Sequence, residues 1–556
     1  MAIAVDRRVP AAAAAFLAAG CWQFATYNGF PNDHYFHVAR AQQMLFGEWP
    51  VRDFVDPGAP LQYVVSAGAR WLVGDGAAPE LLVVALGVAI GAAATVVCAT
   101  WLARSVLAAI GVALLQILAS PRSYSYPKIM LYAIAGCVIV AIAANTTRAR
   151  LIGAGVLTAL AFLMRHDHGL FIGAACAAVI ASSAPGAHAA IRRCALFGAV
   201  ALAVLAPWAI WVQVYQGLVP YFEMGIAVSR READISLLRD LPRLQPSEGL
   251  TTANVHAWMY YLYWSLPILS VPIALWRRFA ARQAWPGESA AVCAIAVLAL
   301  ALDVTFLRNP LETRLPDAVV PASLLGAWLL GLAWRVRAPR RLAPLLRAAS
   351  AWILVVTAIA IWHVGDVREK LDDVGVFDDL EHVREHMAAV VTSITQPEME
   401  VRRLPSRVSA GLVPFFRYLE RCTGPDDRLL VSGPYPDVFV LGRRGFAAGH
   451  IAFLEGWYTT EADQALALER MRRQSVPFVI WPLDDEKTFT TNFPRVFAHL
   501  QAAYEPMVDL PAEGLTGIRI LVERARPRTG TDAATGWPCF APARAAARER
   551  AGGVTG

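Results

Sequence analysis

The chain has 556 residues, of which 56% are hydrophobic and 17% are charged, whereas about a quarter of the residues in soluble domains are charged. The apolar residues come in blocks about as long as a bilayer is thick, which indicates an integral membrane protein and excludes an ordinary soluble one. The net charge of +6 predicts no nucleic-acid partner, because most of the excess arginine lies in short loops between apolar blocks.

Eleven of these blocks are candidates for membrane-spanning helices. The blocks at 105–119 and 151–164 are short for a hydrocarbon core of about 30 Å and suit tilted helices inside a bundle. Arg7 and Arg8 before the first block also suit a signal peptide, but the many later blocks favour an uncleaved first helix. In chain order, we expect spans near 9–29, 79–103, 105–119, 128–145, 151–164, 169–184, 194–214, 257–275, 288–306, 317–334 and 348–365.

The charges in the loops predict the orientation. With the N-terminus in the cytoplasm, every inner loop contains arginine and almost no acid, which is the positive-inside pattern. These loops carry Arg104, Arg148, Arg150, Arg192, Arg193, Arg277, Arg278, Arg282, Arg335, Arg337, Arg340, Arg341 and Arg347. An odd number of spans then places the C-terminal part outside the cytoplasm. The expected location is a plasma membrane, namely a bacterial inner membrane.

The segments outside the spans predict further elements. Two apolar-periodic stretches in the first outer segment, 35–46 and 60–73, suit helices along the membrane interface. After Gly365 comes a charged helical pattern, and the stretch TEADQALALERMRR predicts a helix capped by Thr460 or Thr459. Apolar runs at 427–433, 437–446, 476–483 and 517–524 predict strands. The expected domains are a transmembrane domain 1–365, a helical connector 366–423, an extracytoplasmic α/β domain 424–540 and a flexible tail 541–556.

Candidate chemistry begins directly after the first span, in NDHYFHVARAQQMLFGEWPVRDFVDPGAPLQYVVSAGARWLVG, residues 32–74. Ionisable groups at a membrane boundary are costly unless they pair or have a function. Asp33 suits either a helix-end acid or a catalytic carboxylate, and Arg52 beside Asp53 suits a loop-shaping ion pair equally well. The sequence has no Walker A, GxGxxG or CxxC motif. A transferase acting on the outer face would therefore need an activated donor delivered by the membrane, such as a lipid-phosphate-linked sugar.

This stretch resembles the first outer loop of the GT-C membrane glycosyltransferases, and most of all the bacterial relatives of protein O-mannosyltransferases and aminoarabinose transferases (glycosyltransferase family 39-like). Their pattern is an acidic pair, an aromatic residue, an Ala-rich helix, then G-x-x-P-x-R-D-F and P-L-x-Y. The matching residues are Asp33, Tyr35, Gly47, Pro50, Arg52, Asp53, Phe54, Pro60, Leu61 and Tyr63.

The resemblance implies a mainly α membrane protein with a GT-C-type bundle of about 11 transmembrane helices, interfacial helices in the first outer loop and a small C-terminal α/β domain. It also implies an inverting transfer of a hexosyl or pentosyl group from a polyprenyl-phosphate-linked donor. The acceptor would be a glycan, lipid or protein at the outer face of the membrane.

The same resemblance assigns roles to residues. Asp33 would be the general base that takes the acceptor's proton, with Tyr35, His34 and Asp53 in the substrate pocket. His34 stands where the family has a second acid, and Gly58-Ala59-Pro60 lacks the lysine that often precedes the Pro-Leu element. Another cation must then hold the donor phosphate, for which arginine is well suited. The candidates are Arg52, Lys128, Arg165, Arg308 and Arg314, with Arg314 preferred to Arg308.

The cluster Arg165-His166-Asp167-His168 raises the question of a metal. Residues two apart do not share a helix face, and no Cys or Glu partner is evident, so we predict no metal ligands. Asp167 suits either an aspartate whose hydrogen bonds are satisfied within a helix turn or the second-loop acid that family members often have. No redox or nucleotide cofactor is required, and a divalent metal is compatible with the sequence but unsupported by it.

Two rival functions stay open. A transporter or flippase of lipid-linked sugars would place ionisable groups near the middle of the spans, where Asp303 is nearly alone. A non-catalytic envelope scaffold would use the tail to bind a partner, and the retained Asp33 argues against it. Outside the apolar blocks, Cys422 and Cys539 form a disulfide candidate, because both are expected on the oxidising side of the membrane.

Overall fold

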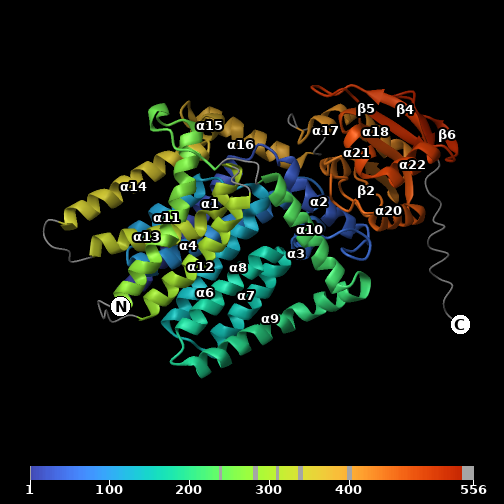
Figure 1. Cartoon of the computed structure of the whole chain (residues 1–556). Helices are drawn as coiled ribbons and strands as arrows, with labels where there is room; N and C mark the ends of the chain where they lie inside the picture. The colour runs from blue at the N-terminus through green and yellow to red at the C-terminus, as the bar shows by residue number, and fades with distance from the viewer. Residues whose placement is uncertain are drawn as a thin grey trace. The chain divides into compact units, whose positions relative to one another are not determined.

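The computed structural model describes residues 2–236, 241–279, 286–308, 312–335, 342–396 and 404–540, so the expected tail at 541–556 lies outside the described residues. The fold divides into two compact units. The helical unit comprises residues 1–27, 81–211 and 232–391, and the sheet unit comprises 28–80, 212–231 and 392–556. Each unit combines segments that are far apart in the chain, as the colours of Figure 1 show. The domain boundaries expected from the sequence stay a prediction.

Each of the eleven expected spans falls on a helix. These are α1 (Ala2–Ala25), α4 (Ala78–Ala103), α5 (Val106–Leu118), α6 (Tyr126–Ala144), α7 (Arg148–Met164), α8 (His166–Ser182), α9 (Ala187–Tyr215), α11 (Thr252–Phe279), α12 (Pro286–Arg308), α13 (Val319–Arg335) and α14 (Leu342–Val364). Among the described residues, α4, α6, α9, α11, α12, α13 and α14 are long and apolar enough to cross a membrane. The helices α5, α7 and α8 are 13 to 17 residues long. Short helices were expected at α5 and α7 but not at α8.

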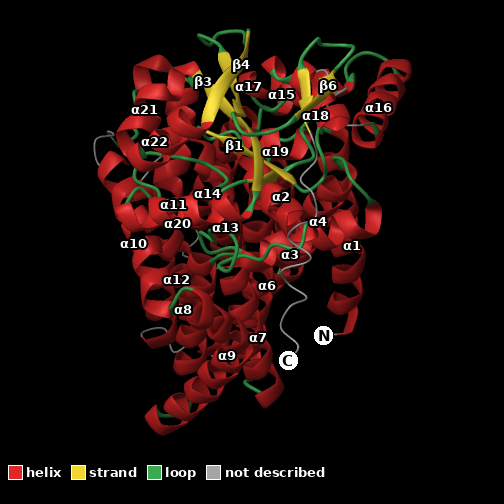
Figure 2. Ribbon diagram, turned by 90° about the vertical axis from the view of Figure 1, so that its right-hand side faces the viewer, coloured by secondary structure: helices red, strands yellow, loops and turns green. Residues whose placement is uncertain are grey.

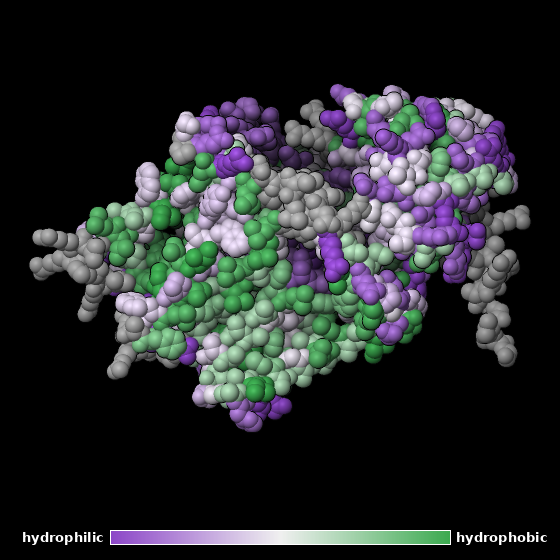
Figure 3. Space-filling view, viewed as in Figure 1, coloured by the Kyte–Doolittle hydropathy of each residue, from purple (hydrophilic) through white to green (hydrophobic). Residues whose placement is uncertain are grey.

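The surface of the helical unit is that of a membrane protein. Hydrophobic side chains cover the face over α6, α7, α8, α9 and α12 in Figure 3, and the exposed residues of α9 include Leu202, Ile210 and Val214. Inside the unit, small residues let helices approach closely. A Cβ on Gly91 of α4 would lie 2.9 Å from the carbonyl oxygen of Ile129 in α6. A larger residue there would push these two helices apart.

The charged pattern after Gly365 forms α15 (Val367–Val374) and α16 (Leu380–Thr395). The segment after α9 forms α10 (Leu218–Ser236). Short 3-10 helices are η1 (Ser123–Ser125), η2 (Pro246–Glu248), η3 (Glu312–Ala318) and η5 (Leu483–Asp485). The segment between α1 and α4 forms α2 (Asn32–Leu45) and α3 (Pro60–Val73), in agreement with the two periodic stretches of the sequence.

The sheet unit is built on a five-stranded sheet in the order β2-β1-β3-β5-β4; its strands are yellow in Figure 2. Strand β1 pairs in parallel with β2 and β3, whereas β5 pairs antiparallel with β3 and β4. The bounds are β1 (Asp427–Val431), β2 (Gly445–Phe446), β3 (Ser475–Pro482), β4 (Tyr504–Leu510) and β5 (Ile518–Glu523), with a hairpin of β6 (Arg528–Thr531) and β7 (Pro538–Phe540). The helices of this C-terminal part are α17 (Arg407–Gly411), α18 (Val413–Cys422), α19 (Asp437–Leu441), α20 (Glu461–Arg473), α21 (Glu486–Asn492) and α22 (Pro494–Ala503).

Local sequence rules account for most of these elements. Thr460 caps α20 in a capping box with Asp463, so Thr460 and not Thr459 is the cap. The strand expected over 437–446 is wrong for its first half, because DVFVL forms α19 and β2 holds only Gly445 and Phe446. A short apolar run that is buried all round has no periodicity to tell a helix from a strand. Cys422 and Cys539 form a disulfide with Cα atoms 4.8 Å apart.

Candidate functional site

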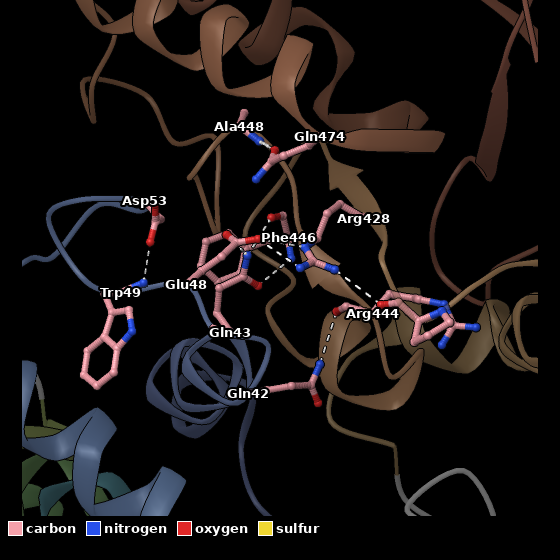
Figure 4. Close-up of polar contacts among 12 residues, drawn as sticks. Gln42, Gln43, Glu48, Trp49, Asp53, Arg428, Arg444, Phe446, Ala448 and Gln474 are labelled. Atoms are coloured by element: carbon pink, nitrogen blue, oxygen red, sulfur yellow. Dashed lines mark hydrogen bonds and ion pairs between the residues drawn. The ribbon is translucent and has the colours of Figure 1, made fainter. Parts of the chain in front are cut away.

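The segment that contains α2 and α3 is bound to the C-terminal sheet within the sheet unit. Figure 4 shows the polar contacts. The amide nitrogen of Gln43 donates to the carbonyl oxygen of Phe446 over 3.1 Å, and its amide oxygen accepts from the Phe446 N–H over 3.0 Å. Gln42 donates to the carbonyls of Phe439 and Arg444, and Arg428 forms a 2.9 Å ion pair with Glu48. The polar residues of α2 therefore recognise the backbone of α19 and β2.

Asp33 lies in the first turn of α2, where its carboxylate is exposed and the helix dipole favours negative charge. The two residues that follow it, His34 and Tyr35, are buried. Burial, followed by the nearby charge of His37, lowers the pKa of His34 to about 4. His34 is therefore neutral at physiological pH.

Arg52 and Asp53 shape the loop that follows α2. The Nη2 atom of Arg52 lies 2.6 Å from Oδ2 of Asp53, and the same nitrogen donates to the carbonyl of Gly47. Oδ2 of Asp53 also accepts from the backbone N–H of Trp49 over 2.7 Å. The hydrogen bond to Asp53 raises the pKa of Arg52. The structure thus contains the Arg52–Asp53 ion pair, which was one of the two roles predicted for Arg52 beside phosphate binding.

The Gly58-Ala59-Pro60 departure from the family pattern is organised by a buried carboxylate, Asp56. Its Oδ1 accepts from the backbone N–H groups of Gly58 and Ala59 and from the Tyr63 hydroxyl. Its Oδ2 accepts from the Tyr221 hydroxyl over 2.9 Å. Four donors satisfy this carboxylate, which accordingly fixes the start of α3. The sequence analysis did not single it out.

A group of charged side chains gathers within the helical unit, and we call it the cation cluster: Arg122, Lys128, Arg165, Asp167 and Asp317. Oδ2 of Asp317, buried at the end of η3, accepts from Arg122 Nη2 over 2.5 Å and from Lys128 Nζ over 2.8 Å. Arg165 Nε lies 3.0 Å from Asp167 Oδ1. Two of the predicted phosphate ligands, Lys128 and Arg165, thus belong to one cluster. The sequence analysis missed Arg122 and Asp317.

The two other predicted phosphate ligands, Arg314 and Arg308, lie in η3 and at the end of α12. Arg314 lies in η3, three residues before Asp317, and side chains at this spacing overlie one another in a 3-10 helix. Arg314 is thus placed on the same short helix as Asp317. Arg308 is the last residue of α12, but its side chain lies outside the described residues.

The side chains of the His-Asp-His cluster do not converge on one point. His166 stacks on Phe162 and its Nδ1 bonds to the Phe162 carbonyl. His168 Nδ1 lies 2.6 Å from the Tyr132 hydroxyl, and its backbone N–H donates to Asp167. The two histidines therefore have different partners. A different group of ligand-type residues, His34, His37 and Glu80, is close enough to hold one ion.

Comparisons with known proteins give one type of match. No model of a known protein family matches the sequence, and no curated protein matches it. Among solved structures, the crystal structure of ArnT from Cupriavidus metallidurans bound to undecaprenyl phosphate matches 93% of this chain and 98% of its own, with 14% sequence identity and a TM-score of 0.51. ArnT is a GT-C aminoarabinose transferase. The chain therefore has the fold of the GT-C membrane glycosyltransferases.

Proposed function

We propose that this protein is an inverting glycosyltransferase that moves a hexosyl or pentosyl group from a polyprenyl-phosphate donor to an acceptor at the outer face of a bacterial inner membrane. The fold supports the class, since the ArnT structure of the same fold holds undecaprenyl phosphate. The observation that carries the proposal is the cation cluster, in which Arg122 and Lys128 converge on the single carboxylate of Asp317.

The charge balance of the cluster favours an anionic ligand. Arg165 is neutralised by Asp167, whereas Asp317 neutralises only one of its two cations. The surplus positive charge is partly shielded from water, because the Lys128 and Arg122 side chains are 13% and 24% exposed. A phosphate would complete this charge balance, and partly buried charges attract it more strongly than exposed ones do.

The acceptor needs a base, and Asp33 is the proposed one. In an inverting transfer, the acceptor oxygen forms the new glycosidic bond while the donor's sugar–phosphate bond breaks. The carboxylate takes the acceptor's proton, and the lipid phosphate leaves with the bonding electron pair. The cations would stabilise that leaving phosphate. Asp33 is exposed on the first turn of a rigid helix, as a base that meets an incoming hydroxyl must be.

Donor capture is tested on the purified full-length protein, with undecaprenyl phosphate as the probe and native mass spectrometry as the readout. Lys128→Met should weaken binding by about tenfold or more, since a charge-assisted hydrogen bond contributes about 1.5–3 kcal/mol. The Asp317 carboxylate keeps Arg122 as its partner, so the variant should still fold. The matched control is Lys487→Met on the exposed face of α21, which should bind normally. Equal binding by both variants would remove the cation cluster from donor capture.

Transfer is tested separately, by mass analysis of envelope glycans and lipid intermediates in two kinds of cells. One strain lacks the gene, and the other is the same deletion strain complemented with the gene. The wild-type gene should restore a glycan that the deletion loses. Asp33→Asn keeps shape but removes the base, and should slow transfer about 10²–10⁴-fold while donor binding stays unchanged. Full restoration by Asp33→Asn would exclude this residue as the base.

A further inference from the structure

Three metal-ligand-type side chains meet in the buried interior of the sheet unit. His34 and His37 are three residues apart on α2, so they share one face of that helix. Glu80, seven residues after the end of α3, points its carboxylate at both rings. The exposed fractions of His34, His37 and Glu80 are 0%, 5% and 1%. One atom from each residue lies within 4.8 Å of the atoms from the other two.

The spacing of these atoms suits metal ligands better than hydrogen bonds. The Nε2 atoms of His34 and His37 each lie 3.5 Å from Oε2 of Glu80, whereas a direct N–H···O bond is about 2.9–3.0 Å long. Ligands at about 2.1 Å from a tetrahedral zinc ion lie about 3.4 Å from each other. Two of the three separations between ligand atoms therefore already match those around a tetrahedral ion.

The polar atoms of the group also call for a further partner. Within the described part of the chain, His37 Nε2 and Glu80 Oε1 are buried and have no hydrogen-bond partner. Such atoms are rare in folded proteins and cost about 1–3 kcal/mol each. Oε2 of Glu80 accepts from the Ser66 hydroxyl over 3.1 Å, an orienting contact of the type that supports metal ligands. Phe30 stacks on the His34 ring at 4.0 Å and fixes its plane.

We propose that His34, His37 and Glu80 bind one divalent transition-metal ion, with zinc as the expected ion. Two imidazole nitrogens and one carboxylate oxygen are a donor set that zinc accepts, and three protein ligands leave a fourth position for water. The ion would join α2 to Glu80, the last residue of segment 28–80, and would hold in place the helix turn that carries Asp33. The metal site does not depend on the proposed transfer reaction being correct, because it is tested by metal content and not by activity.

The metal content is measured by inductively coupled plasma mass spectrometry on full-length protein purified without chelator. The wild type should contain about one zinc ion per chain. Glu80→Gln and His37→Gln should each lower the content at least tenfold. The matched control is His188→Gln, since His188 is an exposed histidine at the start of α9; its zinc content should equal that of the wild type. Gel filtration and circular dichroism establish that each variant is folded.

A second measurement avoids variants that fail to fold. Wild-type protein is stripped with a chelator and titrated with Co²⁺, which gives visible absorption bands in a tetrahedral site. The bands should saturate at one equivalent of Co²⁺, and Zn²⁺ should remove them. Wild-type protein that contains less than a tenth of an equivalent of metal and gives no saturable Co²⁺ spectrum would overturn the proposal. The two histidines and Glu80 would then be a buried ion-pair network.

Discussion

Replacing Gln43 with leucine tests how α2 is held on the sheet. Strand β2 is an edge strand of two residues, and its other side pairs with β1. The N–H and C=O groups of Phe446 face away from β1 and are both satisfied by the side-chain amide of Gln43. That amide therefore takes the place of a neighbouring strand, and covers an edge that would otherwise be open to pairing.

The magnitude follows from these two hydrogen bonds. Gln43→Leu keeps the size and the burial of the side chain but leaves one donor and one acceptor of Phe446 unsatisfied. Each unsatisfied buried group costs about 1–3 kcal/mol. The lower end applies to both, since water reaches a two-residue edge strand once the amide is removed. The sum is about 2 kcal/mol, which corresponds to roughly a 30-fold change in the local opening equilibrium at 1.4 kcal/mol per factor of ten.

Hydrogen exchange with mass spectrometry reads this change directly, because exchange of a protected amide reports its local opening free energy. The peptide that contains Phe446 should exchange roughly 30-fold faster in Gln43→Leu than in the wild type. The control Gln501→Leu replaces an exposed glutamine of α22 and should leave that peptide unchanged. Exchange within threefold of the wild type in Gln43→Leu would refute the inference that this amide holds the edge of β2.

Three further predictions concern the sheet unit and its side of the membrane. Cys422→Ala, which opens a disulfide spanning 117 residues, should destabilise the α/β part by about 4–5 kcal/mol on the chain-entropy estimate; thermal unfolding of the wild type with and without reductant checks the value. Burial lowers the pKa of His450 to about 3, below its unfolded value of about 6.5. The free energy of unfolding should therefore fall as the pH drops from 6.5, by about 2 kcal/mol at pH 5. His450→Phe should remove this part of the loss, as measured by urea titrations. A C-terminal reporter that fluoresces only in the cytoplasm should stay dark, and strong fluorescence would reverse the predicted orientation.

The sequence predicted the helical unit well, because its signals are local. Length and hydropathy select spans without reference to any partner, and all eleven expected blocks lie on helices. Sheet elements depend on neighbours, and here prediction was weaker. Strand β4 was not predicted, since its sequence YEPMVDL contains Pro506 and alternates poorly. In the structure, β4 is an edge strand with a register shift beside Pro506, where proline is tolerated.

The candidate sites show a sharper limit. Lys128 and Asp317 are 189 residues apart, and no spacing rule brings a lone aspartate in a later loop to a lysine at the start of α6. Glu80 lies in the first turn of α4, 43 residues after His37, and only the fold brings its carboxylate within 3.5 Å of both histidines. One signal was available, because two histidines three residues apart share a helix face. The sequence stretch HYFH at 34–37 could thus have indicated a site, but its third ligand could not be found without the fold.

From the sequence, Arg52 suited a loop-shaping ion pair and phosphate binding equally well, and the fold favours the ion pair. Its side chain is 36% exposed and bonds to Asp53 and Gly47, so its donors already serve the loop. An ion pair this exposed contributes at most about 1 kcal/mol, and Arg52→Ala should leave the protein folded. Undecaprenyl phosphate should then bind Arg52→Ala within about threefold of the wild type, whereas Lys128→Met binds about tenfold more weakly. An equal loss of affinity in both variants would return Arg52 to the list of phosphate ligands.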